Sequence, residues 1–193
     1  MFNIRYASIR NLDISNGQGI GIALFVQGCH FHCNNCFNKD TWDFNGGKEW
    51  TNDIKNEFIK LIDKPYISRV SILGGEPLAN ENVEDVLKLI LEIKNKYPNK
   101  AIWLYTGYEV ENLFLNTTCC EYLLGEKTME EVINITSTNL IKQMLVAQCD
   151  VVIDGKYIDE LRDLTLKFRG SSNQKIIDIK KSLEKNEVVL WSE

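Results

Sequence analysis

The sequence has no apolar run long enough to span a bilayer, and its start, Met1-Phe2-Asn3-Ile4-Arg5, lacks the apolar core of a signal peptide. It also lacks a long block of Lys or Arg, an internal repeat and a low-complexity segment, and its net charge is -5. We therefore expect a cytoplasmic protein that binds neither membranes nor nucleic acid. Because cytoplasmic thiols stay reduced, its six cysteines are better candidates for metal ligands than for disulfides.

The length and composition predict one globular domain. The chain has 193 residues, of which 44% are hydrophobic and 25% are charged. We expect residues 1–193 to share one core, with a tail from about residue 176 that packs against the body. This tail combines a possible short helix with the apolar run Val188-Val189-Leu190-Trp191.

Strand-like and helix-like segments alternate along the chain. Short apolar runs predict buried strands, which are Ile20–Val26, Val70–Leu73, Ala101–Tyr105 and Val151–Ile153. Apolar residues at helical spacing predict helices over Ile54–Ile62 and Val83–Ile90, and Thr128-Met129-Glu130-Glu131 has the form of a capping box. The stretch from Glu109 to Cys149 is otherwise less regular. This order predicts an α/β fold with parallel strands and right-handed crossovers, either a partial barrel or an open sheet.

The most distinctive segments each follow a predicted strand. They are the cysteine loop after Val26, Gly74-Gly75-Glu76-Pro77, Thr106-Gly107 and Asp154-Gly155. Because parallel strands end at the same edge, we expect these four segments to meet at one rim of the sheet.

Three cysteines, Cys29, Cys33 and Cys36, lie within eight residues. Three thiolates leave one position open on a metal centre, which suits a cubane iron–sulfur cluster with one iron not bound by protein. The alternative is a zinc site closed by His30, His32 or Cys149. Each histidine is poorly placed for this, because it lies next to a ligand in a tight loop. The vicinal pair Cys119-Cys120 has awkward geometry for a common metal site, and we expect no role for it.

The glycine pair Gly74-Gly75 lets backbone come close to a ligand, although a plain strand-to-loop turn would use the same residues. Taken together with the cysteines, the motif resembles the radical S-adenosylmethionine enzymes. In these enzymes a Cys-x3-Cys-x2-Cys loop follows the first strand, and a Gly-Gly-Glu-Pro segment follows the second. Here the aromatic Phe37 comes directly after the last cysteine, and Gly74–Pro77 matches the second segment.

Further blocks narrow the resemblance to the activating proteins of anaerobic (class III) ribonucleotide reductases. The blocks are Cys36–Phe44, Leu104–Tyr108, Asp150–Lys156 and Phe168–Gln174. They extend from near Asn16 to about Asp178. The region around 113–140 does not align, and we expect it to be a family-variable insertion.

The resemblance implies a fold, a cofactor set and an activity. The fold would be a partial (β/α) barrel of the radical SAM type. Cys29, Cys33 and Cys36 would hold a [4Fe-4S] cluster whose remaining iron binds S-adenosylmethionine. Residues with backbone or ring contacts to the nucleoside would be Asn35, Cys36 and Phe37, and those at the methionine end would be Gly74, Gly75 and Glu76.

As an oxidoreductase of this type, the protein would cleave S-adenosylmethionine reductively to methionine and a 5′-deoxyadenosyl radical. That radical would take a hydrogen from a glycine of the anaerobic ribonucleotide reductase large subunit. Electrons would come from a low-potential donor such as flavodoxin or ferredoxin. Thr106 and Lys156 would lie at the rim, and Arg169–Gln174 would be either a capped turn or a docking loop for the partner.

Two alternatives remain at this stage. One is an activase of another glycyl-radical enzyme, of the formate-lyase type, against which the blocks around Trp42 and Arg169–Gln174 argue. The other is a non-enzymatic zinc or electron-transfer module, which leaves Gly74–Pro77 unexplained.

Overall fold

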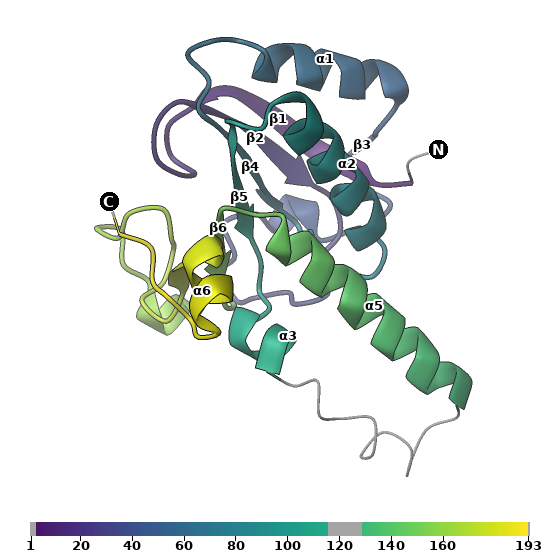
Figure 1. The fold of residues 1–193 in the computed structure, drawn as a ribbon, viewed down its shortest axis with the longest axis vertical. Helices are drawn as coiled ribbons and strands as arrows, with labels where there is room; N and C mark the ends of the chain where they lie inside the picture. The colour runs from purple at the N-terminus through teal and green to yellow at the C-terminus, as the bar shows by residue number, and fades with distance from the viewer. Residues whose placement is uncertain (1–2, 116–128, 193) are drawn as a thin grey trace.

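The computed structural model describes residues 3–115 and 129–192 and is built on one seven-stranded sheet (Figure 1). The strand order is β3-β1-β2-β4-β5-β6-β7. The strands are β1 (Arg5–Asp13), β2 (Gly21–Val26), β3 (Lys48–Glu49), β4 (Arg69–Gly74), β5 (Ala101–Tyr105), β6 (Val151–Asp154) and β7 (Lys175–Asp178). The helices are α1 (Asn52–Ile62), α2 (Val83–Lys96), α3 (Val110–Leu115), α5 (Met129–Ala147) and α6 (Ile179–Lys185), with short 3-10 helices η1 (Lys39–Thr41) and η3 (Asp159–Leu161).

The centre of the sheet is parallel and its edges are antiparallel. β2, β4, β5 and β6 run parallel, with Val70 level with Ile22 on one side and Ile102 on the other. β1, β3 and β7 pair antiparallel. The prediction of parallel pairing is therefore confirmed for the four strands that it named, and the three antiparallel strands beside them were not predicted. Within the described residues β3 and β7 end the order on opposite sides, so the sheet is open.

All four predicted strands and both predicted helices form, with ends within a few residues of those expected except that α2 continues to Lys96. The Thr51 hydroxyl accepts the N–H of Ile54 and caps α1, which satisfies one of the free amides of its first turn. α5 begins at Met129, while Thr128 of the predicted capping box lies outside the described residues. The irregular stretch expected between Glu109 and Cys149 is instead largely helical from Met129 onward.

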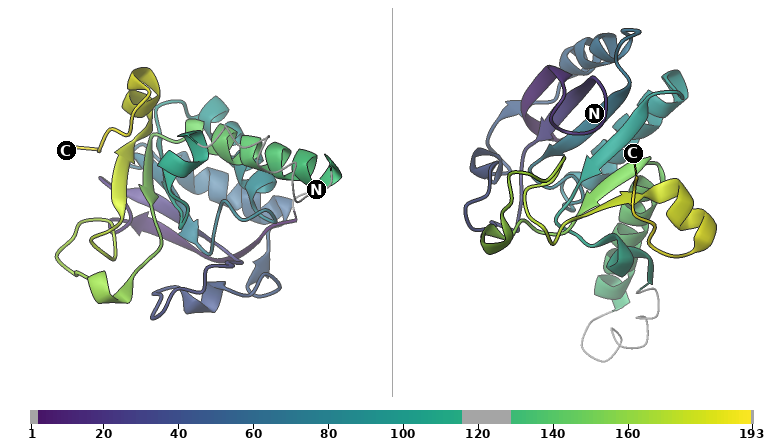
Figure 2. Two further views of the ribbon diagram at one scale, coloured as in Figure 1. Left: turned by 90° about the horizontal axis from the view of Figure 1, so that it is seen from below. Right: turned by 90° about the vertical axis from the view of Figure 1, so that its left-hand side faces the viewer.

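The helices cover one face of the sheet. Figure 2 shows α1, α2 and α5 on the same side of the sheet. Strand side chains alternate between faces, and those on this side pack with α1, α2 and the end of α5 into the main core. The buried aliphatic strand residues of this core are Ile22, Leu24, Val26, Val70, Ile72, Ile102, Leu104, Val152 and Ile177, and Tyr6 of β1 joins them. Each fully buried aliphatic side chain of this kind contributes about 1.5–3 kcal/mol to folding.

The opposite face carries two small apolar clusters and is covered by loops. Ala23, Phe25 and Leu73 form one cluster, and Trp103 centres the other. The ring of Trp191 packs edge-on against Trp103 at 5.2 Å between centroids. The prediction that the tail packs against the body is therefore confirmed, although Ile176 and Ile177 belong to β7 rather than to the tail.

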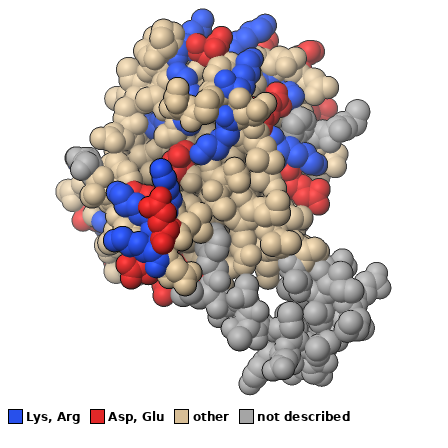
Figure 3. Space-filling model, viewed as in Figure 1, with Lys and Arg blue, Asp and Glu red and all other residues tan. Residues whose placement is uncertain are grey.

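The helices and one face of the surface bear on the expectations about membranes and nucleic acid. No helix in the described parts of the chain is both long and apolar enough to cross a membrane. On the face shown in Figure 3, described Lys and Arg side chains are interspersed with Asp and Glu. Such a mixed face differs from the continuous basic surface that attracts nucleic acid.

A buried ion pair fixes the loop between β1 and β2. The Arg69 guanidinium, 1% exposed, donates from Nη2 to Asp13 Oδ1 over 2.8 Å and from Nη1 to the Ser71 hydroxyl. Asp13 in turn accepts the backbone N–H of Asn16 at 2.9 Å. The pair therefore sets the position of Asn16 relative to the sheet.

We predict that replacing Arg69 by methionine lowers the free energy of unfolding by about 3 kcal/mol or more, because it leaves the Asp13 carboxylate buried without its cation. Lys60→Met, an exposed cation on α1, is the matched control and should cost less than about 0.5 kcal/mol. Denaturant unfolding followed by circular dichroism measures both. Equal midpoints for Arg69→Met and wild type would contradict the structural role of the pair.

Candidate functional site

The loops after the four parallel strands meet in one cavity of about 610 Å³. Its lining includes Cys29, Cys33, Cys36, Gly74, Gly75, Glu76, Thr106, Gly107, Gly155 and Lys156. The predicted meeting of strand-end segments at one rim is therefore confirmed. The cavity extends over the helix-free face of the sheet, where Phe25, Leu73 and Tyr105 form part of its wall.

The cysteine loop is folded back on itself by backbone hydrogen bonds. The N–H of Gly28 donates to the Thr41 carbonyl at 2.7 Å, and that of Cys29 donates to the Trp42 carbonyl at 3.0 Å. Gly28 has a φ of +93°, and a side chain there would overlap the Phe44 ring. Within the loop, the Asn38 N–H lies 3.4 Å from Cys36 Sγ. Amide donors to sulfur are typical of thiolates that bind iron–sulfur clusters.

Burial keeps the thiols of Cys29 and Cys33 protonated. Burial raises the pKa of Cys29 to about 11, and it also raises the pKa of Cys33, to which the neighbouring Cys36 adds. A metal centre that binds these cysteines must therefore displace their protons, as structural metal sites do.

Neither histidine of the loop is placed as a ligand. His30 Nε2 lies 2.9 Å from Glu81 Oε1, and the His30 ring packs on Phe44. The His32 ring stacks on Trp42 at 4.6 Å. Cys149 is buried in the main core, where its thiol bonds the Leu145 carbonyl at 3.4 Å. The arrangement thus disfavours a zinc site closed by any of these residues.

The three cysteines suit a cluster better than a single ion. All three line the same cavity, but among the described residues no three Cys, His, Asp or Glu side chains are grouped closely enough to hold one metal ion. A cubane needs no such grouping, because each of its thiolates binds a different iron. The residues present therefore fit a [4Fe-4S] cluster.

The glycine pair brings the end of β4 against the cysteine loop. The N–H of Glu76 donates to the Gly28 carbonyl at 2.7 Å, and that of Gly75 donates to Val26 at 2.8 Å. A side chain on Gly75 would overlap the Gly28 carbonyl, and Gly74 has a φ of +103°. The two glycines are needed because the segment after β4 comes very close to the cysteine loop. A plain strand-to-loop turn would not require that contact.

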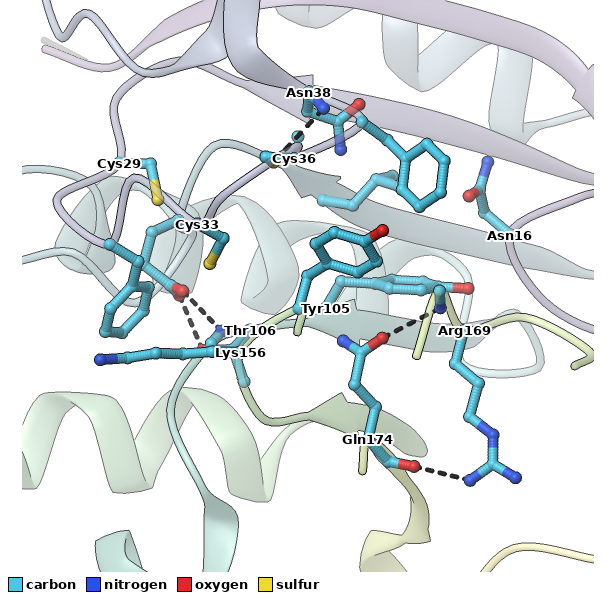
Figure 4. Close-up of a pocket in the computed structure, with 18 of the residues that line it drawn as sticks. Asn16, Cys29, Cys33, Cys36, Asn38, Tyr105, Thr106, Lys156, Arg169 and Gln174 are labelled. Atoms are coloured by element: carbon cyan, nitrogen blue, oxygen red, sulfur yellow. Dashed lines mark hydrogen bonds between the residues drawn. The ribbon is translucent and has the colours of Figure 1, made fainter. Parts of the chain in front are cut away.

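Glu76 joins the ends of β4 and β5. Its side chain is buried, and Oε1 accepts hydrogen bonds from the Leu78 N–H at 2.8 Å and the Thr106 hydroxyl at 2.7 Å. Oε2 accepts the Gly107 N–H at 2.7 Å. Burial raises the pKa of Glu76 to about 7 despite these donors. Figure 4 shows the bond to the Thr106 hydroxyl in the same cavity as Cys29 and Cys33.

Lys142 is a buried cation that the sequence interpretation missed. It lies on α5, is 5% exposed, and its ammonium donates to the Tyr108 hydroxyl at 3.3 Å and lies 4.4 Å above that ring. The Tyr108 ring contacts the edge of Phe31 in the cysteine loop. Burial lowers the pKa of Lys142. The low helical periodicity of α5 gave no signal that position 142 faces inward.

Of the other residues predicted at the site, Phe37 and Lys156 line the cavity, whereas the Asn35 side chain does not. Phe37 lines the cavity and packs against Tyr157 at 5.1 Å. The Asn35 side chain instead lies outside the lining and donates to Asp159 Oδ2 at 2.6 Å, which ties the cysteine loop to η3. Lys156 lines the cavity with its ammonium 4.6 Å above the Phe31 ring.

The Arg169–Gln174 loop is internally bonded and also lines the cavity. Gln174 Oε1 accepts the N–H groups of Gly170 and Ser171, and its Nε2 donates to the Gly155 carbonyl at 3.0 Å. Arg169 Nη1 donates to the Gln174 carbonyl at 2.6 Å (Figure 4). The loop is therefore a bonded turn that lines the cavity, as the first of the two predictions says, and its role as a docking loop stays a prediction.

Comparison with known proteins defines the class first. Residues 15–177 match a family model described as a 4Fe-4S single cluster domain. This agrees with three cysteines in one cavity and with the arrangement that disfavours a zinc ligand set.

The family follows from individual relatives. Anaerobic ribonucleoside-triphosphate reductase-activating protein of Escherichia coli K12 is 34% identical over 89% of this chain and 96% of its own length. The proteins of that name from Vibrio cholerae and Enterobacteria phage T4 are 31% and 32% identical, each over 90% of this chain and over 97% and 93% of their own lengths. The chain belongs to the family of anaerobic ribonucleoside-triphosphate reductase-activating proteins, which confirms the predicted resemblance.

We predict that the Glu76 carboxyl makes stability fall as pH rises. Its pKa of about 7 in the folded protein is above its value in the unfolded chain, so the folded state holds this proton more tightly. Between about pH 5 and 8 the free energy of unfolding should fall by about 2 kcal/mol relative to Glu76→Gln. Urea unfolding of iron-free, reduced protein across this range measures the difference.

Glu184→Gln, at an exposed position of α6, is the control and should follow the wild-type profile. A difference between wild type and Glu76→Gln that stays constant with pH would contradict the prediction.

Proposed function

We propose that this protein activates the anaerobic ribonucleotide reductase by installing a glycyl radical on its large subunit. The observation that carries the proposal is that Cys29, Cys33 and Cys36 share a cavity with Gly74–Glu76, in a chain of this activating-protein family. In outline it is a radical SAM oxidoreductase of one domain, residues 1–193, that acts in the cytoplasm. The region around 113–140 is then a family-variable insertion.

The fold proposed for this activity is a partial barrel of the radical SAM type. Four parallel strands with helices on one face support it, as does a cavity on the other face that collects the strand-end loops. Active sites of parallel α/β folds lie at the carboxyl ends of the strands.

Cys29, Cys33 and Cys36 would hold the cluster, with the Asn38 N–H donating to Cys36 Sγ. When bound, the reduced cluster supplies the electron that cleaves S-adenosylmethionine to methionine and a hydrogen-abstracting 5′-deoxyadenosyl radical. The aromatic wall of Phe31, Phe37 and Trp42 would exclude water from this end of the cavity.

Gly74, Gly75 and Glu76 would position the methionine end of S-adenosylmethionine. Glu76 Oε2 accepts only one hydrogen bond from the described residues, so it retains a lone pair for an ammonium group. Phe37 and the backbone of Asn35 and Cys36 would contact the nucleoside, and the Asn35–Asp159 hydrogen bond would hold that segment in place.

The partners follow from the same proposal. The large subunit of the anaerobic reductase would present the glycine, and a low-potential donor such as flavodoxin or ferredoxin would supply electrons. An activase for a formate-lyase-type partner uses the same chemistry, but the names of the relatives favour the reductase. The positions of His30, His32 and Cys149 weigh against a zinc module.

We predict that Cys33→Ala abolishes the cluster, because two thiolates leave a cubane with two unprotected irons. Wild-type protein purified without oxygen should be brown and contain about four irons per chain. Cys119→Ala is the matched control and should keep that iron content. Iron and sulfide analysis with visible absorption measures both, and a full cluster in Cys33→Ala would show that the ligands are assigned wrongly.

The activity has its own test. Protein reduced with dithionite and given S-adenosylmethionine should release methionine and 5′-deoxyadenosine, and added reductase should acquire a glycyl radical visible by electron paramagnetic resonance. A formate-lyase-type partner serves as the comparison. A radical only on that partner would overturn the choice of reductase, and colourless, zinc-loaded protein that stays inert after reconstitution would overturn the enzyme proposal.

A further inference from the structure

The cavity extends well beyond the cysteines. Figure 4 shows Cys29 and Cys33 on one side and Asn16, Arg169 and Gln174 on the other. We call the second group, together with Tyr105, the distal end; its members are Asn16, Tyr105, Arg169 and Gln174, and all of them line the cavity. They come from three separate segments, the β1–β2 loop, the end of β5 and the loop before β7.

Two buried polar atoms of the distal end have no hydrogen-bond partner among the described residues, the Tyr105 hydroxyl and Arg169 Nε. Gln27 Oε1, Trp50 Nε1 and Arg69 Nε also lack a partner among the described residues, but these residues do not line the cavity. Tyr105 and Arg169 do line it, so their unpaired groups are available to a ligand there. Burial also raises the pKa of Tyr105, which keeps its hydroxyl protonated and able to donate.

The surrounding groups are held in place by their own bonds. Asn16 is fixed by Asp13, and Asp13 by the buried Arg69. Arg169 is fixed through the Gln174 carbonyl. The distal end is therefore a prearranged set of neutral and cationic donors and amide groups. Leu164, which is 75% exposed, lines the same cavity.

The chemistry of the distal end matches a peptide backbone. Extended backbone offers carbonyl acceptors and N–H donors, and glycine adds no side chain that would compete for room. Arg169 Nε can donate only to an acceptor, whereas the Tyr105 hydroxyl and Asn16 can both donate and accept. The Asp163 carboxylate also lines the cavity near Arg169 and offsets part of the positive charge of this end.

We propose that the distal end binds the extended backbone of the reductase segment that carries the target glycine, with Tyr105 and Arg169 bonding its carbonyl groups. The inference rests on the proposed function and adds to it the residues that select the protein substrate. The cysteine end is then left to the cluster and the cofactor.

Tyr105→Phe tests the proposal because it removes only the hydroxyl. That hydroxyl has no partner among the described residues, so the melting temperature should not fall. Binding of the reductase large subunit, measured by titration calorimetry without reductant, should weaken about fivefold. The KM for S-adenosylmethionine in the cleavage reaction without reductase should change less than twofold.

Tyr97→Phe is the control, since the Tyr97 hydroxyl bonds the Ile59 carbonyl on the helix side of the sheet and lies outside the cavity lining. It should leave both binding and KM unchanged. Arg169→Lys keeps the charge but removes Nε, and it should weaken binding of the reductase as Tyr105→Phe does.

Three outcomes decide the matter. Weaker reductase binding with an unchanged KM for S-adenosylmethionine supports the proposal. A raised KM with unchanged reductase binding would assign the distal end to the cofactor, and no change in either quantity would leave it without a binding role; both overturn the proposal. Failure of the wild type to bind the reductase or to cleave S-adenosylmethionine would instead refute the proposed function itself.

Discussion

The site depends on the contact between the end of β4 and the cysteine loop. The Glu76 N–H bonds the Gly28 carbonyl, and the Glu76 carboxylate accepts donors from its own turn and from the end of β5. One buried residue thus links three strand-end segments that are far apart in the chain. The contact is possible only because Gly75 has no side chain to collide with Gly28. Parallel pairing brings these segments to one edge, and this contact then sets their spacing.

Much of the fold could be predicted from local patterns, and the exceptions share a cause. β2, β4 and β6 are buried on both faces, so they read as continuous apolar runs. β1 is mostly half-buried or exposed, with only Tyr6 and Asp13 buried, and β7 is mostly half-buried, so neither has such a run. Both are edge-side strands whose formation depends on pairing with a neighbour. That pairing is a long-range property, which the sequence of the strand itself does not encode.

The same distinction separates the parts of the site. The cysteine spacing and the Gly-Gly-Glu segment are local, and the residues that they predicted, apart from the Asn35 side chain, line the cavity. Lys142 and Tyr105 were not predicted as functional, because their surroundings come from distant segments. Lys142 meets Tyr108 across 34 positions of sequence, and Arg69 meets Asp13 across 56. Buried charges of this kind carry no motif, since only the folded chain supplies their partners.

The electrostatics of the cavity differ between its two ends, which suits the two kinds of ligand proposed for them. At the cysteine end, burial raises the pKa values of Cys29 and Glu76. Both raised pKa values disfavour the Cys29 thiolate and the Glu76 carboxylate. A cation bound next to either group would lower its pKa again. Iron at the thiols and an ammonium group at Glu76 are cations of this kind. The groups of the distal end are a hydroxyl, amides and a guanidinium, which need acceptors, and the guanidinium already has the Asp163 carboxylate near it. A backbone carbonyl meets that need, so one cavity can hold a cationic cofactor and a neutral peptide without exchanging their places.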